Sequence, residues 1–191
     1  KKVIFLKIYK KKKLKDTKIR WIKNFNEIKK GPIIFFGNEF FDALPIKQFL
    51  YKNGSLLEKC YIVNPKTGLN EAYKTASHKD LEKIKSFKIL KGLKFIEYPK
   101  LGLIELDKMV KKIKKQNGGI LLIDYGYLNT LNKNTLQTVM KNKKININSL
   151  FKNLGKADVT SLVNFSLLEE YFKKKKLNVK NIVSQKFFLE K

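Results

Sequence analysis

The sequence has very few of the residues that build metal clusters and disulfides. Cys60 and His78 are its only cysteine and histidine in 191 residues. A single cysteine cannot form an internal disulfide, which fits a reducing compartment. One histidine and one cysteine also cannot form a His/Cys metal cluster, so we predict no metal and exclude a structural zinc site. No apolar run approaches the roughly 20 residues of a membrane-spanning helix, and we expect no membrane span.

Arginine is almost absent, although the chain is strongly basic. Arg20 is the only arginine among 43 basic residues, and with 16 acidic residues the formal net charge is +27. Nucleic-acid readers favour arginine, because its guanidinium pairs bidentately and stacks. Lysines spread over the whole chain instead indicate a compositional bias, although they still attract anionic partners. Nucleic acid is thus a partner that we do not favour, and the sequence gives no oligomeric state.

Length and composition predict one domain, residues 1–191. Hydrophobic residues make up 43% of the chain, which is enough to build a core. The sequence begins without an initiator methionine or a signal-peptide pattern and stops within the apolar stretch that starts at Phe187. We expect from both ends that it is a piece of a longer protein.

Two short apolar runs and one amphipathic segment indicate an α/β fold. Residues 32–37 and 120–123 have the apolar composition of buried parallel strands. Residues 103–115 carry apolar side chains at helical spacing, and Gly118-Gly119 ends that helix before the second strand. A helix, a glycine pair and a buried strand make half of a βαβ unit, so we predict a parallel α/β sheet.

The other segments give weaker patterns. Residues 48–63 alternate around Asn53-Gly54, the strongest short-range signal of a β-hairpin. Residues 64–80 are polar and predict a loop, and we expect a variable loop over about 64–92. Elsewhere we predict, in chain order, a strand end passing into a helix at 3–15, a short helix at 167–176 and a late strand at 181–189.

Polar and acidic residues follow both predicted parallel strands. Asn38, Glu39 and Asp42 come after the first strand, and Asp124 comes after the second. Because ligands bind outside the carboxyl ends of strands in open α/β sheets, we expect the three carboxylates to line a pocket for a cationic group. The alternative is structural, since acids at such positions also cap helices, and Asp42 could cap the segment that follows it.

A series of motifs resembles the MidA-like family of class I methyltransferases, which use S-adenosyl-L-methionine. Residues 38–45 (Asn-Glu-Phe-Phe-Asp-Ala-Leu-Pro), followed by Gln48-Phe49, are the most specific of them. The remaining matches are weaker singly, but their order over residues 20–189 strengthens them: Glu97-Tyr98-Pro99, Gly118-Gly119, Asp124-Tyr125-Gly126, Thr135-Leu136-Gln137, residues 155–160, Val163-Asn164-Phe165 and residues 185–189.

The resemblance implies a fold, a cofactor and a reaction. The fold would be a partial Rossmann-like class I sheet with an inserted β-hairpin at about 48–63. The cofactor would be S-adenosyl-L-methionine, and the reaction would be N-methylation of an arginine in a protein substrate. The family's eukaryotic members make a subunit of respiratory complex I the candidate substrate. The expected location is the cytoplasm in a bacterium or the mitochondrial matrix in a eukaryote.

The resemblance also implies roles for the acidic residues. Glu39 would orient the substrate guanidinium, with Asp42 and Asp124 as its partners in catalysis. A carboxylate suits this role, because a delocalised guanidinium is a poor nucleophile until an acid orients it and localises its lone pair.

Further residues would line the cofactor and the substrate. Asn38 and Phe40 would lie at the methyl end of the cofactor, and Tyr125 would touch its adenine or the substrate. Asp158 and Thr160 would form the substrate wall, and the structural alternative for them is a turn with a helix cap.

The sequence departs from the family at several points. The family's Glu-x-Gly-x-Gly turn, which cradles the methionyl end of the cofactor, has no counterpart here. The acidic partner of the cofactor ribose either lies upstream or is replaced by Lys7, and lysine cannot accept its hydrogen bonds. Asn142 occupies the position of a histidine of the family, and Asn164 occupies the position of an aspartate.

These departures imply that the fragment is inactive by itself. A class I sheet without its first strands would also leave one face of the strand at 32–37 exposed. The alternative function is a non-catalytic, lysine-rich interaction module that binds RNA or an acidic protein.

Overall fold

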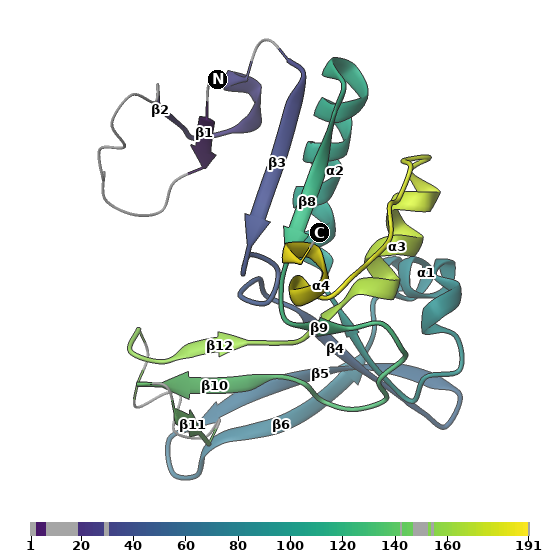
Figure 1. Ribbon diagram of the computed structural model, residues 1–191. Coiled ribbons are helices and arrows are strands. Elements are labelled where there is room, and N and C mark those ends of the chain that lie inside the picture. The colour runs from purple at the N-terminus through teal and green to yellow at the C-terminus, as the bar shows by residue number, and fades with distance from the viewer. Residues whose placement is uncertain are drawn as a thin grey trace. The chain divides into compact units, whose positions relative to one another are not determined.

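The computed structural model describes residues 3–6, 19–28, 31–141, 143–146, 153 and 155–190 (Figure 1). Lys7 and Asn142, at which the sequence departs from the family that it resembles, lie outside these residues. The chain forms two compact units, Lys1–Phe36 with Glu105–Leu121 and Gly37–Ile104 with Leu122–Lys191. The chain contains helices together with parallel and antiparallel pairs of strands, so the fold is mixed α/β.

The first unit begins with two short parallel strands, β1 (Val3–Leu6) and β2 (Ile19–Ile22). β1 agrees with the strand end expected at the start of 3–15, and the helix expected after it falls outside the described residues. A one-turn 3-10 helix, η1 (Phe25–Glu27), follows β2. The Ile28 carbonyl accepts a hydrogen bond from Lys112 Nζ at 2.8 Å, which fixes this segment to helix α2 (Lys100–Gln116).

The two predicted parallel strands are confirmed as β3 (Ile33–Asn38) and β8 (Gly118–Ile123), which form a two-stranded sheet. The Ile33 N–H donates to the Asn117 carbonyl at 3.0 Å, and the Glu39 N–H donates to the Ile123 carbonyl at 2.9 Å. From the first of these hydrogen bonds to the second, the residue numbers increase along both strands, so β3 and β8 are parallel. The predicted helix over 103–115 is α2, which precedes β8.

One face of β3 is open to solvent. Exposed and half-buried residues alternate along the strand, and Ile34 and Phe36 are 78% and 63% exposed. On the other face, the ring of Phe35 packs edge-on against Phe25 with 5.2 Å between the centroids. Parallel strands are normally covered on both faces, so this exposure marks a surface that the described part of the chain leaves uncovered.

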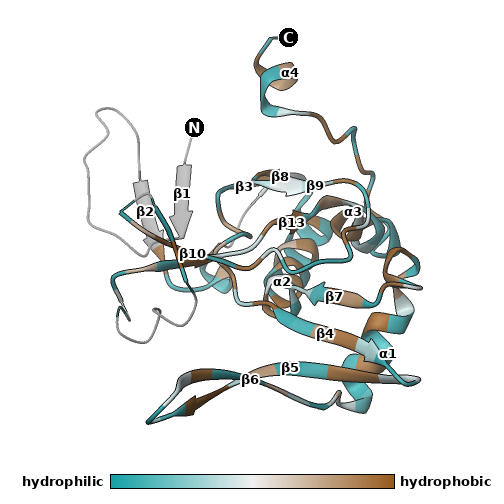
Figure 2. Cartoon of the chain, turned by 90° about the horizontal axis from the view of Figure 1, so that it is seen from below, coloured by the Kyte–Doolittle hydropathy of each residue, from teal (hydrophilic) through white to brown (hydrophobic). Residues whose placement is uncertain are grey.

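The second unit contains a four-stranded antiparallel sheet in the order β6-β5-β4-β7 (Figure 2). Asn53 and Gly54, both at positive φ, make the tight turn between β4 and β5. This confirms the hairpin expected at 48–63, because only residues that tolerate positive φ fit such a turn. Phe49 and Ile96 lie opposite each other on β4 and β7 and are fully buried. The strands are β4 (Lys47–Lys52), β5 (Ser55–Asn64), β6 (Gly68–Thr75) and β7 (Phe95–Tyr98).

The expectation of a loop over 64–80 was wrong. The polar residues 68–75 form the edge strand β6, where Leu69 is buried and most other side chains face solvent. Helix α1 (His78–Ser86) follows, with Ser77 as its N-cap, and η2 (Lys88–Leu90) comes next. An edge strand does not need apolar alternation on both faces, and Pro65 with Gly68 bounds only a short turn. The variable loop expected over 64–92 is therefore largely regular structure.

The remaining elements of the second unit include two more small sheets. β9 pairs in parallel with β13, and β10 lies between β11 and β12 in antiparallel pairing. The short helix predicted over 167–176 is confirmed as α3, and the Asn164 side chain caps it by accepting the Leu167 N–H at 3.0 Å. These elements are β9 (Gly126–Tyr127), β10 (Gln137–Met140), β11 (Lys143–Ile145), β12 (Asp158–Thr160), β13 (Val163–Asn164) and α3 (Phe165–Lys174).

The late strand predicted over 181–189 was also wrong. Residues 185–189 form a short helix, α4 (Gln185–Leu189), which begins after Ser184. The Ser184 hydroxyl accepts the Phe187 N–H at 3.2 Å, so a local N-cap overrides the weak alternation.

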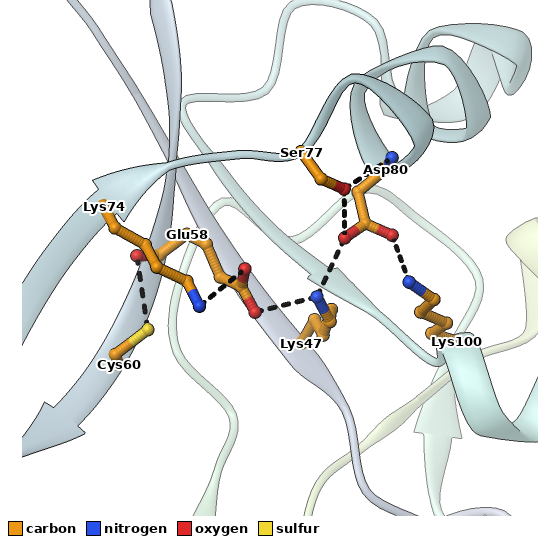
Figure 3. Close-up of polar contacts among 7 residues, drawn as sticks. All are labelled: Lys47, Glu58, Cys60, Lys74, Ser77, Asp80 and Lys100. Carbon is orange, nitrogen blue, oxygen red and sulfur yellow. Dashed lines mark hydrogen bonds and ion pairs between the residues drawn. The ribbon is translucent and has the colours of Figure 1, made fainter.

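A cluster of charged side chains around the buried Asp80 joins α1 to the four-stranded sheet and to α2 (Figure 3). Asp80, only 1% exposed, accepts hydrogen bonds from Lys47 Nζ at 2.8 Å and from Lys100 Nζ at 2.7 Å. Lys47 also pairs with Glu58 at 2.9 Å. Burial by itself would raise the pKa of Asp80, but the hydrogen bonds from Lys100, Lys47 and Ser77 outweigh it and lower that pKa to about 2.

Candidate active site

The structure brings the three predicted acids together beyond the carboxyl ends of β3 and β8. Glu39 and Asp42 lie on the loop after β3, and Asp124 directly follows β8. Burial is the main cause that raises the pKa of Asp42, and the charges of Asp124 and Glu39 raise it further. The Asp42 carboxylate therefore senses the charges of Glu39 and Asp124, and an added positive charge beside it would be favoured.

The carboxylate of Asp124 is surrounded by backbone donors. Its Oδ2 accepts the N–H of Phe41 at 2.8 Å and that of Phe40 at 3.1 Å, with a longer contact of 3.4 Å from the Asp42 N–H. Its Oδ1 accepts the Tyr125 N–H at 2.9 Å. Successive N–H groups that converge on one anion form a nest, so Asp124 holds the loop after β3 in place.

The same loop bends sharply at Glu39. This residue has φ +46°, a left-handed conformation that is uncommon for a side chain other than glycine. Its side chain is exposed, while the next residues turn inward and Phe41 is buried in the core. Phe41 packs against Gly102 of α2, where an added Cβ would lie 2.5 Å from the ring atom Cε1. The backbone that carries the exposed Glu39 side chain is thus fixed.

Asp42 connects the loop after β3 to the segment after β12. Its carbonyl accepts the Ser161 N–H at 3.0 Å. Its Oδ1 is buried and makes no hydrogen bond within the described part of the chain. A buried carboxylate oxygen without a donor is free to accept one from a ligand.

The predicted cofactor residues lie on both strand ends. Asn38 is exposed at the end of β3 and Phe40 is half-buried in the loop that follows. Tyr125 is 64% exposed, yet its backbone is fixed, because its N–H bonds to Asp124 and its carbonyl accepts the Val163 N–H at 2.8 Å. An exposed ring on a fixed backbone is suited to stack on a planar ligand.

The two predicted substrate residues belong to β12. Thr160 is half-buried, and its Oγ1 accepts a hydrogen bond from Gln137 Nε2 at 3.2 Å. It directly precedes Ser161, which bonds to Asp42, so Thr160 comes close to the acidic residues along the chain. Asp158 is exposed at the other end of β12, opposite Val139 of β10, and the expected alternative of a turn does not describe this strand.

A second polar cluster, around Glu97 of β7, was given no role by the sequence reasoning. Glu97 Oε1 accepts hydrogen bonds from Gln48 Nε2 at 2.8 Å and from the Thr135 N–H at 3.0 Å. Gln48 Nε2 also donates to Asn134 Oδ1 at 2.7 Å. Gln48 is buried, and a buried polar residue within the apolar pattern of β4 was the signal that could have identified this cluster.

The Glu97 cluster and the acidic site meet at two consecutive residues. The Ser161 N–H donates to the Asp42 carbonyl, and the Leu162 N–H donates to Thr135 Oγ1 at 3.0 Å. Glu97 therefore holds the segment that carries Thr160 against the loop after β3.

Tyr127 of β9 lies near the same cluster. Burial raises the pKa of Tyr127 to about 12, the charge of Glu97 adds to this rise, and a hydrogen bond with Asn164 opposes it. Its hydroxyl therefore stays protonated at neutral pH and serves as a fixed hydrogen-bonding group. Asn164 also caps α3, so both functions of its side chain are structural.

Among the residues that the structure describes, no group of three or more histidine, cysteine, aspartate or glutamate side chains is placed to hold a metal ion. No helix within the described ranges has the length and hydropathy to cross a membrane.

Comparison with known proteins identifies related sequences. Residues 6–183 match the model of a family described as "Putative S-adenosyl-L-methionine-dependent methyltransferase". The Caenorhabditis elegans protein arginine methyltransferase NDUFAF7 homolog, mitochondrial, is 28% identical over 170 residues, which are 87% of this chain and 39% of that protein. The Danio rerio protein arginine methyltransferase NDUFAF7, mitochondrial, is 24% identical over 152 residues, which are 80% of this chain and 35% of that protein.

The fold resembles solved structures from Burkholderia thailandensis. One, with S-adenosyl-homocysteine bound, superposes with a TM-score of 0.60 at 17% identity over 82% of this chain and 41% of the other. A native structure of a protein of the same superfamily gives a TM-score of 0.60 at 16% identity. The chain spans less than half the length of the curated relatives and solved chains that it matches.

Proposed function

Because the chain belongs to this family of S-adenosyl-L-methionine-dependent methyltransferases, we propose that it supplies the substrate-facing part of a protein arginine N-methyltransferase site. The single observation that carries the proposal is the placement of Glu39, Asp42 and Asp124 outside the ends of two parallel strands, where the charges of Asp124 and Glu39 act on Asp42. Both curated relatives are named protein arginine methyltransferases. Their identity to this chain is low, so arginine specificity is proposed from the acids and the relatives together.

A guanidinium needs nearby carboxylates to react, and this site provides them. It is cationic and delocalised, so its nitrogen attacks only when a carboxylate holds it and localises its lone pair. Glu39 is exposed on a fixed, left-handed backbone and is our candidate for that contact. Asp42 adds a buried oxygen without a donor, and Asp124 adds negative charge while it holds the loop. Alignment and electrostatics are the main tasks of a protein that catalyses such a displacement.

The residues of the site fit part of the cofactor. Tyr125 has an exposed ring on a fixed backbone, and Asn38 and Phe40 adjoin the proposed substrate acid, so these side chains would hold the methyl-donor end or the adenine. The bound cofactor would supply an electrophilic methyl group on a sulfonium. The glycine-rich turn and a ribose-binding acid of the resembled family have no counterpart among these 191 residues. We therefore expect weak cofactor binding and no turnover by this chain alone.

We further propose a domain organisation, a substrate and a location for this function. Residues 1–191 would be one incomplete methyltransferase domain, with a Rossmann-like sheet into which the β4–β5 hairpin is inserted. Thr160 and Asp158 would form the substrate wall. The substrate would be a protein, with a subunit of respiratory complex I as the candidate. The location would be the bacterial cytoplasm or the mitochondrial matrix, and the curated relatives are named mitochondrial.

Calorimetric titration separates this function from the alternative of a lysine-rich RNA-binding module. An arginine tripeptide and a single-stranded RNA would each be titrated into the chain and into its Glu39→Gln variant. The proposal predicts heat from the peptide that the variant abolishes. RNA binding that Glu39→Gln leaves unchanged, together with no peptide binding, would support the interaction module instead.

A further inference from the structure

The last part of the described chain combines a high density of lysine with exposed apolar side chains. Residues 173–190 contain six lysines and one glutamate. The lysines are Lys173, Lys174, Lys175, Lys176, Lys180 and Lys186. Four large apolar side chains in the same segment are strongly exposed: Val183 at 41%, Phe187 at 48%, Phe188 at 51% and Leu189 at 71%.

The apolar residues are held on a short, ordered element. α4 begins at the Ser184 cap and contains Phe187, Phe188 and Leu189. In Figure 2 this helix stands clear of α1 and α3. Exposed apolar side chains that gather within a few residues and are flanked by charges mark an interaction surface.

A second lysine-rich segment lies next to the first. The carbonyl of Ser86, at the end of α1, accepts a hydrogen bond from Lys174 Nζ. Glu170 of α3 accepts the N–H of Lys88 at 2.8 Å and that of Ile89 at 2.9 Å. These bonds place the end of α3 beside the segment that carries exposed lysines 83, 85, 88 and 91. One side of the second unit therefore gathers lysines from two distant parts of the sequence.

We propose that residues 173–190, together with the lysines of 83–91, form a peripheral docking surface for a membrane rich in anionic phospholipid. Lysine clusters bind anionic headgroups electrostatically, and adjacent apolar side chains enter the boundary between headgroups and acyl chains. An RNA partner would explain the lysines and the phenylalanines, since bases stack on aromatic rings. It would not explain the exposure of Val183 and Leu189, because a base cannot stack on their aliphatic side chains. Transfer of these side chains from water into a membrane would be favourable.

Vesicle sedimentation tests the docking surface with the 191-residue chain. Vesicles of phosphatidylcholine with phosphatidylglycerol would be compared with vesicles of phosphatidylcholine alone. We expect binding to the anionic vesicles only. Phe188→Ser with Leu189→Ser should weaken it about thirtyfold, because each side chain loses on the order of 1 kcal/mol of apolar burial. Lys173→Ala with Lys176→Ala should weaken it to a similar extent, about thirtyfold, because each lysine near the surface contributes about 1 kcal/mol.

Matched controls separate a defined surface from the general positive charge. Ile62→Ser with Val63→Ser removes two exposed apolar side chains of β5, and Lys111→Ala with Lys114→Ala removes two exposed charges of α2. Each control should change the affinity less than twofold. Equal weakening by the test and control variants would overturn the proposal.

Two readouts complete the test. In a Trp21→Phe background, Phe188→Trp should shift the tryptophan fluorescence to the blue on vesicle binding, whereas Ile62→Trp should not. Binding of transfer RNA that the Phe188→Ser and Leu189→Ser changes leave intact, without any vesicle binding, would contradict the proposal. Thermal melts of each variant ensure that a lost affinity does not reflect unfolding.

Discussion

Asp124 Oδ2 accepts the backbone N–H of Phe41 at 2.8 Å, and this bond joins the end of β8 to the loop after β3. Neighbouring donors from Phe40 and Tyr125 complete the shell of the same carboxylate. The side chain that the sequence marks as catalytic therefore also determines the shape of the loop that presents Glu39. Loss of the carboxylate should affect both stability and the site.

Asp124→Ala should destabilise the chain by about 2–3 kcal/mol, because several partly buried N–H groups lose their acceptor. The measurement is the free energy of unfolding from urea denaturation. Asp158→Ala is the matched control, since this aspartate is exposed on β12 and its removal should change stability by less than about 0.5 kcal/mol. Equal effects of the two substitutions would show that the backbone donors do not depend on Asp124.

Gly102→Ala should cost roughly 1–3 kcal/mol, because the added methyl group would overlap the buried ring of Phe41. Gly119→Ala provides the control: nothing lies within 4 Å of a Cβ at that position. Thermal unfolding of both variants measures the difference. If Gly102→Ala melts at the wild-type temperature, the ring does not pack against α2 as described.

Asp80 should make stability depend on acid pH. Its pKa of about 2 lies below the ordinary value of 3.8, so its ion pairs are fully present above about pH 4 and are lost as the pH falls toward 2. The expected loss is about 2 kcal/mol. Urea denaturation at several pH values should show this slope in the wild type and a flatter one in Asp80→Asn. Asp158→Asn, which removes an exposed carboxylate of β12, is the matched control.

The ionised carboxylate of Asp42 should affect the pH dependence of stability in the opposite direction to that of Asp80. Its raised pKa means that the ionised carboxylate opposes folding, and this cost is present at neutral pH and disappears as the pH falls below the unfolded-state pKa. Asp42→Asn should therefore raise the melting temperature at pH 7, with the gain shrinking toward pH 4. A lower melting temperature for the variant at pH 7 would contradict the burial and repulsion that we assign to this residue.

The sequence predicted the elements whose signals are local. The apolar runs of β3 and β8, the periodic α2 and the Asn53-Gly54 turn are confirmed, because burial on both faces, helical spacing and positive φ each leave a direct mark on composition. β6 and α4 were missed because they leave only weak signals in the sequence. An edge strand needs few apolar residues, and a five-residue helix depends on one capping serine.

The positions of the three acids at the strand ends were predictable from the sequence, but their contacts were not. Residue order placed Glu39, Asp42 and Asp124 at two strand ends, and the structure brings them together. The sequence could not show that Asp124 faces backbone N–H groups, because those donors have no side-chain identity. The link from Glu97 through Thr135 to Leu162 was equally hidden, since it joins residues far apart along the chain.

The most direct test of the account asks whether the Glu39 site recognises a guanidinium. Amide signals of Asn38, Phe40 and Tyr125 would be followed by NMR while an arginine tripeptide is titrated, with a citrulline tripeptide as its neutral match. The account predicts shifts at these residues with arginine only, and their loss in Glu39→Gln. Equal shifts with citrulline, or none at these residues with arginine, would contradict it.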